Sequence, residues 1–286
     1  MQSLKSVFEK ARREGWAVPH FNISNFELLK AVVEAAHEKA SPLLIGTSEG
    51  ERDYIGLETA VALVRAYRET YAFPLYLNAD HSYSVETAKA AVDAGYDSIH
   101  IDLSKKPLAE NIAGTKEVVL YAKNKNPEIS VEGEIGYFVT DSSTVYKKDI
   151  DVPIESLARP EEAVEFVEKT GVDRLAPVVG GIHGVARNAG HLDIERVGEI
   201  HGALPEITLV LHGGSGDPPE EIQAAIVRGI ANVHISTDLR VAWREALMKE
   251  ITREEYAPYK IMGPVVEAVK KIAILNIDIF KSAGRC

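Results

Sequence analysis

The residues best suited to metal chemistry are three histidines, each of which follows an apolar run typical of a β-strand. Three neutral imidazoles on one rim can bind a zinc ion and leave a fourth position for water or a substrate. Neutral ligands also leave the charge of the ion available to polarise an oxygen atom. The three are His81 after residues 75–78, His183 after residues 175–179, and His212 after residues 208–211. Each alone is equally consistent with a satisfied rim or core histidine, but together they predict a zinc site.

Carboxylates occupy similar positions after neighbouring strand-like runs. Asp80 stands beside His81, where a carboxylate can exchange protons with an oxygen near a metal ion, or can orient a ligand histidine. Asp102 and Glu134 end two further runs and offer oxygen ligands to a second, harder cation. Glu132 lies on the same strand face as Glu134, and the pattern does not decide which of the two is structural.

Two short segments near the end of this series are suited to binding an anion. Residues 212–216 read His-Gly-Gly-Ser-Gly, and glycines allow backbone amides to face a ligand. Ser236-Thr237-Asp238 adds hydroxyls and amides at the start of a helix. Loops after the last two strands of an α/β barrel commonly bind phosphate, so we predict a phosphate cradle there.

These side chains share one edge only if their strands are parallel and joined by helices. Apolar runs alternate with amphipathic helical stretches eight times. The expected strands are residues 17–21, 43–47, 75–78, 98–101, 129–131, 174–178, 208–211 and 232–235. The expected helices are residues 26–39, 57–71, 85–94, 107–123, 160–169, 194–201, 219–228 and 239–249. The sequence therefore predicts an α/β fold, a (β/α)8 TIM barrel, with an open doubly wound sheet as the rival.

The remaining segments complete this picture. The tail from Glu254 predicts one or two extra C-terminal helices outside the barrel, and we expect residues 1–286 to form a single domain. Residues 136–158 are polar and poor in periodicity, so we expect a mobile loop.

Composition narrows the classes of function. The chain has 286 residues, 26% of them charged, and a net charge of −11, which disfavours nucleic acid as the main partner. The single cysteine, Cys286, excludes a thiolate metal cluster and fits a reducing compartment. The sequence shows neither an apolar signal core at its start nor a run of about 20 apolar residues. We therefore expect a cytoplasmic protein without a membrane partner.

With these residues in place, the chain resembles the class II, zinc-dependent ketose-bisphosphate aldolases, which include fructose- and tagatose-bisphosphate aldolase. The resemblance covers most of the chain, and its motifs are highly specific together. They are Val18-Pro-His-Phe-Asn22, Ala40-Ser-Pro-Leu-Leu44, Leu77-Asn-Ala-Asp-His81, Asp93-Ala-Gly-Tyr-Asp-Ser98, Glu110-Asn-Ile112, Thr115-Lys-Glu-Val118, Val131-Glu-Gly-Glu-Ile-Gly136, His183-Gly184, Leu211-His-Gly-Gly-Ser-Gly216, Ile235-Ser-Thr-Asp-Leu-Arg240 and Phe280-Lys-Ser-Ala-Gly284.

The resemblance implies reversible aldol cleavage of a ketose phosphate or bisphosphate, such as fructose 1,6-bisphosphate. The products would be dihydroxyacetone phosphate and an aldehyde, formed through a metal-stabilised enediolate. It implies zinc on His81, His183 and His212, an alternate metal position at Asp102 and Glu134, and Asp80 as the acid–base group. A second cation, divalent or monovalent, and a homodimer or homotetramer are also implied. The substrate residues implied are Asn22, Ser48, Gly184, Gly213, Gly214, Ser215, Ser236, Thr237 and Asp238.

Three departures from the family pattern bear on the substrate and the α-proton base. His234 stands where the family commonly has a substrate-contacting asparagine, so an imidazole enters the cavity. The loop after Gly136 lacks the usual glycine pair and acidic residues, and Asp141 is its only early carboxylate. A Tyr-Lys pair is absent after Gly184, and Arg187 is the cation expected to replace it. The base is therefore Asp141 or His234, with Glu132 or a metal-bound water as the remaining candidates.

Three other readings stay open at this stage. The first is a class II aldolase-like enzyme that acts on a different sugar phosphate. The second is a metal-dependent hydrolase, which would release inorganic phosphate instead of a triose. The third is a non-catalytic accessory subunit, which would bind the metal without turnover.

Overall fold

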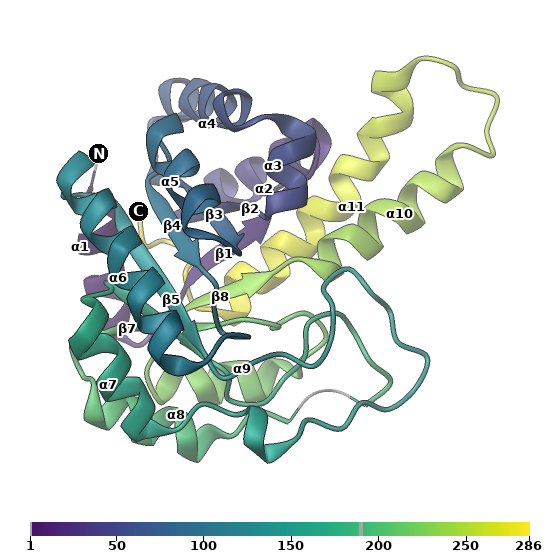
Figure 1. Ribbon diagram of the computed structural model, residues 1–286. Coiled ribbons are helices and arrows are strands. Elements are labelled where there is room, and N and C mark those ends of the chain that lie inside the picture. The colour runs from purple at the N-terminus through teal and green to yellow at the C-terminus, as the bar shows by residue number, and fades with distance from the viewer. Residues whose placement is uncertain (1, 189–190) are drawn as a thin grey trace.

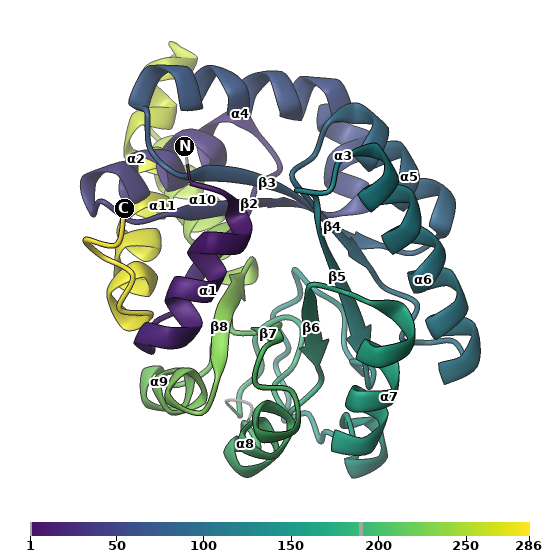
Figure 2. The ribbon, with the colours of Figure 1, turned by 90° about the vertical axis from the view of Figure 1, so that its left-hand side faces the viewer.

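The computed structural model describes residues 2–188 and 191–286 and shows a closed barrel of eight parallel strands with helices outside it (Figure 2). Each strand pairs with its neighbours in chain order, and β1 pairs with β8. The strands are β1 (Val18–Asn22), β2 (Leu43–Thr47), β3 (Leu75–Ser82), β4 (Ser98–Ile101), β5 (Ser130–Ile135), β6 (Arg174–Pro177), β7 (Thr208–Leu211) and β8 (Ile230–Ile235). The predicted barrel is confirmed, and closure excludes the open sheet.

Helices follow the strands and cover the barrel (Figure 1). They are α1 (Leu4–Glu14), α2 (Phe26–Glu38), α3 (Glu49–Ile55), α4 (Leu57–Tyr71), α5 (Val85–Ala94), α6 (Leu108–Lys125), α7 (Pro160–Thr170), α8 (Ile194–Ala203), α9 (Pro219–Val227), α10 (Thr237–Glu250) and α11 (Pro258–Ile279). Sequence reasoning missed α3, because this two-turn helix lies in a stretch with little apolar periodicity. Its start is nevertheless encoded, since Ser48 and Glu51 form a capping box.

Apolar packing closes the end of the barrel opposite the carboxyl ends of the strands. Leu4, Val7 and Phe8 of α1 pack with Val18 and Tyr76 from the start of two strands. A separate and larger apolar core lies between the strands and the outer helices. The interior of the barrel is therefore sealed at one end, and polar side chains fill it toward the other.

The largest differences from the predicted strand bounds lie at the carboxyl ends of β3 and β5. β3 extends to Ser82 and β5 to Ile135, so Asp80 and Glu134 lie within strands and not after them. The pairing of β3 with β4 shifts register between Ala79 and Ser82, and His81 has φ +44°. This left-handed backbone is uncommon for histidine. It interrupts the alternation of side chains, which allows adjacent Asp80 and His81 to face the same mouth.

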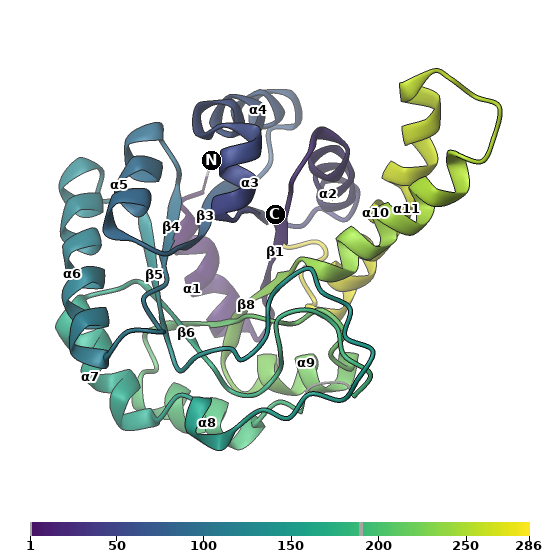
Figure 3. The ribbon, with the colours of Figure 1, turned by 45° about the vertical axis from the view of Figure 1, so that its right-hand side comes forward.

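The C-terminal helices confirm the predicted extension. α10 and α11 form a hairpin that projects away from the barrel (Figures 1 and 3), and α11 also packs on α2. Residues 137–158 form a long loop that is irregular apart from one short 3-10 helix, Ile154–Ser156. Among the described residues, no helix is both long and apolar enough to cross a membrane.

Candidate metal centre and active site

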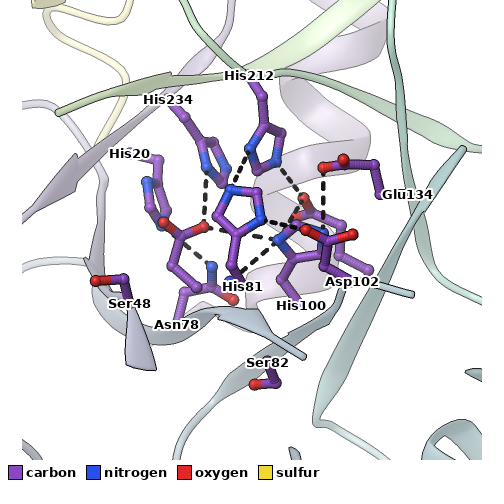
Figure 4. A network of polar contacts seen from close by, with 12 residues as sticks. His20, Ser48, Asn78, His81, Ser82, His100, Asp102, Glu134, His212 and His234 are labelled. Carbon is purple, nitrogen blue, oxygen red and sulfur yellow. Dashed lines mark hydrogen bonds and ion pairs between the residues drawn. The ribbon is translucent and has the colours of Figure 1, made fainter. Parts of the chain in front are cut away.

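Histidines and carboxylates from neighbouring strands converge at the carboxyl end of the barrel (Figure 4). His81 on β3 and His212 after β7 approach across the mouth, with Nε2 of His81 and Nδ1 of His212 3.1 Å apart. The far nitrogen of each ring has a carboxylate partner. Nδ1 of His81 lies 2.9 Å from Asp102, and Nε2 of His212 lies 2.7 Å from Glu132. An ionised carboxylate only accepts hydrogen bonds, so each partner favours an N–H on the far nitrogen of its histidine.

The protonation states of His81 and His212 indicate what can bind between their facing nitrogens. Burial alone would lower the pKa of His81, but the carboxylates of Asp80 and Asp102 outweigh it and raise the pKa to about 10. Burial and the neighbouring His234 hold the pKa of His212 well below its usual range. A proton on His81 therefore points at a lone pair of His212. A metal cation suits this place once that proton leaves, because both facing nitrogens then present lone pairs.

The third predicted ligand, His183, approaches from β6 at a greater distance. Its ring centroid lies 5.1 Å from that of His81 and 6.1 Å from that of His212, and it stacks on Phe138 at 3.9 Å. Burial, followed by the charge of His81, lowers its pKa to about 3, so the ring is neutral and able to ligate. Asp80, His81, His100 and His212 offer four possible ligand atoms that all lie within 4.8 Å of one another, and His183 is not among them.

A buried ion pair below the mouth holds His212 in place. Glu132 and Arg174 are both fully buried, and their charged groups lie 2.6 Å apart. Arg174 also donates to Asn232 at 2.9 Å and to Ser130 at 3.2 Å. Burial would raise the pKa of Glu132, but Arg174 and the surrounding histidines outweigh it and hold the carboxyl ionised. Glu132 is thus the anion that fixes the orientation of His212.

Asp80 is oriented from several sides. The amide of Asn22 donates to its Oδ2 at 2.9 Å and to Glu51 at 3.1 Å. Nδ1 of His234 and Nδ1 of His100 lie 3.4 and 3.7 Å from its Oδ1. Burial would raise the pKa of Asp80, but His81 and these two histidines outweigh it, so the pKa falls well below the usual range. Asp80 is therefore an ionised, fixed carboxylate at the mouth.

Asp102 and Glu134 lie beside each other on the far side of His81. Both accept from the hydroxyl of Ser104, at 2.6 and 3.2 Å. Burial and the charge of Asp102 raise the pKa of Glu134 well above its usual value. His81, Asp102 and Glu134 form a second compact group of possible ligand atoms.

The predicted anion cradle lies between the ends of β7 and β8. The hydroxyl of Ser215 accepts from the amides of Ser236 and Asp238 at 3.2 and 3.3 Å, which ties the two segments together. Gly213 has φ +71°, and a Cβ there would lie 2.5 Å from the carbonyl oxygen of Ile182. Glycine is therefore required where this backbone turns toward the pocket.

Asp217, just beyond the cradle, is a buried acid without a cation partner among the described residues. Its Oδ2 makes no hydrogen bond within the described chain. Burial, followed by the carboxylates of Glu221 and Asp238, raises its pKa to about 8. The protonated form is therefore favoured in the fold.

One pocket brings most of the predicted site residues together. Those that line it are Asn22, Ser48, Asp80, His81, Asp102, Glu134, Asp141, His183, Gly184, His212, Gly213, Ser215, His234, Ser236 and Thr237. Gly214 and Asp238 support the cradle without lining this pocket. Arg187 also lies outside it, because its guanidinium pairs with Asp149 at 3.1 Å and its side chain is 74% exposed. The structure thus provides no support for Arg187 as the cation of the cradle.

Several residues of this network were not predicted from the sequence. His20 stacks on His234 with ring centroids 3.5 Å apart, and His100 lies beneath His81. Period-two alternation places Ser98 and His100 on the same face of β4, and the pairing of His100 with Glu132 in register continues the polar layer into β5. Polar residues at alternate positions of otherwise apolar strands were the signal that could have identified them.

Comparison with known proteins agrees with this geometry. A family model described as "Fructose-bisphosphate aldolase class-II" matches residues 2–285. A fructose-bisphosphate aldolase of Staphylococcus aureus (strain Mu50) is 37% identical, with 99% of this chain and 98% of that protein covered. One from Geobacillus stearothermophilus is 36% identical, with the same coverage. The crystal structure of the YdjI aldolase from Escherichia coli K12 superposes with a TM-score of 0.85 at 29% identity, covering 99% of this chain and 98% of that one.

Proposed function

The chain belongs to the class II fructose-bisphosphate aldolase family, and from this premise we propose that it cleaves a ketose phosphate, with zinc as its metal, into dihydroxyacetone phosphate and an aldehyde. The observation that carries the proposal is the pair of facing nitrogens on His81 and His212, beside an ionised Asp80. Residues 1–286 would act as one domain.

In this proposal His81, His183 and His212 hold the zinc ion. When bound, the ion supplies a positive charge that polarises the substrate carbonyl. Asp102 and Glu132 keep a proton on Nδ1 of His81 and on Nε2 of His212. The lone pairs of the other two nitrogens, Nε2 of His81 and Nδ1 of His212, are then free to bind the ion. Asp102 and Glu134 provide oxygen ligands for a second cation position.

Asp80 is the proposed proton acceptor for the hydroxyl at the bond that breaks. Its low pKa keeps it ionised, and the hydrogen bond from Asn22 fixes the direction of its Oδ2. In the reverse reaction the same group returns the proton to the new hydroxyl. The contacts of Asp80 with Asn22 and His234 hold the carboxylate in place, which reduces the reorganisation that proton transfer requires.

The cradle of Gly184, Gly213, Ser215, Ser236 and Thr237 is proposed to bind the phosphate of the dihydroxyacetone phosphate half. Thr237 begins α10, so the start of that helix faces the pocket and favours an anion. Ser48, at the end of β2, is a further substrate contact.

The α-proton base is proposed to be Asp141, with His234 as the alternative. Asp141 lies on the loop after β5 and lines the pocket as an exposed carboxylate. His234 is buried, lies 3.4 Å from Asp80, and also lines the pocket.

The proposed assembly is a homodimer or homotetramer. The projecting hairpin of α10 and α11 supports it, because Ile251, Tyr256 and Tyr259 expose 62%, 89% and 77% of their surface. A molar mass in solution equal to one chain would contradict it.

The test is a panel of phosphorylated and unphosphorylated ketoses, with the triose products, phosphorylated or not, and inorganic phosphate quantified by mass spectrometry. Fructose 1,6-bisphosphate, fructose 1-phosphate and fructose form a matched series. Loss of the 1-phosphate should lower kcat/KM by roughly 10²-fold or more, because several charge-assisted hydrogen bonds disappear. Equal turnover of fructose would contradict the cradle, and release of inorganic phosphate without a triose would indicate a hydrolase.

A further inference from the structure

His20 is a fully buried histidine that has no part in the proposed reaction so far. It lies on β1 directly beside His234 of β8 in the register of the two strands. The two rings stack with their centroids 3.5 Å apart and their planes 8° apart. His234 lines the active-site pocket, whereas His20 does not. His20 can therefore influence a substrate only through the residues that it contacts.

The neighbouring strand β2 provides the space that the His20 ring fills. Gly46 on β2 does not adopt the left-handed backbone that favours glycine, so its conformation alone would allow another residue. A Cβ at this position would nevertheless overlap Cε1 of His20 and lie 2.5 Å from its Nε2. The amide of Asn78 on β3 donates to the same Nε2 at 3.1 Å. Gly46 and Asn78 together fix the place of the ring.

The ring of His234 is held on two sides and at one edge. Figure 4 shows it between the rings of His20 and His212, and the His212 centroid lies 4.1 Å away. At its edge, Nε2 of His234 lies 3.2 Å from Oδ1 of Asn232. The amide group of Asn232 cannot turn freely, because its Nδ2 donates to the carbonyl of Val18 at 2.8 Å. Removal of His20 would leave one side of the His234 ring without its packing partner.

The opposite edge of His234 faces the proposed acid–base group. Its Nδ1 lies 3.4 Å from Oδ1 of Asp80. Oδ2 of Asp80 accepts from Asn22, but Oδ1 makes no hydrogen bond with the residues that the structure describes. Oδ1 is therefore the oxygen left to take the proton of a substrate hydroxyl. Because His234 and Asp80 line the same pocket, the position of the His234 ring limits the direction from which a hydroxyl reaches Oδ1.

We propose that His20 is a positioning residue, which holds His234 beside Oδ1 of Asp80, and that residue 46 is glycine because the His20 ring needs its space. This inference rests on the proposed aldolase function and adds a residue outside the pocket to it. A shifted His234 ring would misalign the hydroxyl with Asp80, which affects proton transfer more than binding. A misplacement of about 1 Å can cost roughly 10²-fold in rate.

The test is a double-mutant cycle on the zinc-loaded enzyme, with kcat and KM measured for a ketose phosphate that the wild type cleaves. His20→Ala is made in the wild type and in a His234→Asn background. Gly46→Ala, which displaces the His20 ring, is made in the same two backgrounds and in His20→Ala. Gly114→Ala is the matched control, because it also adds a methyl group to a closely packed glycine, but on α6.

His20→Ala should lower kcat by about 10-fold or more, change KM by less than about 3-fold and keep its zinc. In the His234→Asn background the same change should lower kcat by less than about 2-fold, because His20 acts through His234. Gly46→Ala should reproduce the loss in the wild type but add little to His20→Ala. Gly114→Ala should retain kcat within about 2-fold.

An equal loss of kcat in both backgrounds would overturn the inference, because His20 would then support the barrel without acting through His234. An unchanged kcat in His20→Ala, a change confined to KM, or loss of zinc would also overturn it. If His20→Ala does not fold, Gly46→Ala in the two backgrounds provides the same comparison. A wild-type enzyme that cleaves no ketose phosphate would overturn the proposed function and this inference with it.

Discussion

Replacement of Glu132 by glutamine tests how the buried ion pair supports the metal site. The variant keeps the shape of the side chain but leaves the guanidinium of Arg174 buried without its anion, 2.6 Å from the former carboxylate. Loss of one partner of a fully buried pair costs about 3–5 kcal/mol. For 286 residues the unfolding entropy is about 0.6 kcal/mol/K, so the Tm of the metal-free protein should fall by roughly 5–8 °C.

The same substitution should weaken zinc binding. An amide can donate to Nε2 of His212, which would move the proton of that ring to Nδ1, the nitrogen that faces His81. Loss of such a hydrogen-bond partner typically lowers metal affinity by about 10–100-fold. Competition with a chromophoric chelator measures this affinity, and calorimetry measures the Tm.

Two controls separate the ion pair from a general effect of mutating the barrel interior. Glu134→Gln changes a carboxyl that is already favoured in its protonated form, so its Tm in the metal-free protein should change by less than about 2 °C. The double variant Glu132→Met/Arg174→Met removes both charges and should be more stable than Glu132→Gln. If Glu132→Gln kept the wild-type Tm and zinc affinity, the role assigned to this pair would be wrong.

Three further predictions concern other acids and His234. Asp80→Ala should retain zinc while turnover falls by roughly 10²–10⁴-fold; loss of zinc in this variant would show that Asp80 supports the metal instead. The pKa of Asp217 is about 8 when folded and about 4 when unfolded, so stability should fall as pH rises from about 4 to 8. Asp217→Asn should remove that slope, and denaturation at several pH values measures it; an unchanged slope would contradict the raised pKa. If Asp141 is the α-proton base, Asp141→Ala should abolish exchange of the α-hydrogen of dihydroxyacetone phosphate with solvent, followed by NMR. Exchange that survives in Asp141→Ala but collapses in His234→Ala would assign the base to His234, and exchange unaffected by either would exclude both.

Much of the fold could be predicted from the sequence because the strands are short, apolar and separated by regular helices. Strands β2, β4 and β7 have the bounds expected from their apolar runs. β3 and β5 are longer than expected, because polar residues continue the strand into the barrel mouth. Apolar periodicity ends before the strand does, since its last residues face a polar interior.

The candidate site was predictable in its residues at the carboxyl ends of strands but not in their supports. His81, His183 and His212 stand out because each follows an apolar run. Arg174 and His100 stand out less, because a polar residue inside a strand can be recognised by its alternation with apolar neighbours but gives no sign of its partner. Their contacts join strands distant in the chain, as Arg174 on β6 does with Asn232 on β8. The ion pair of Arg187 with Asp149 could not be predicted for the same reason, since Asp149 lies in a loop without periodicity.

The most direct test of the central claim is the rate of dihydroxyacetone phosphate formation from fructose 1,6-bisphosphate and related ketose phosphates, before and after removal of the metal. The purified protein should contain about one zinc per chain. Chelation should abolish cleavage, and added zinc should restore it, because the paired histidines need a cation to polarise the substrate carbonyl. Full cleavage by metal-free protein would contradict the account.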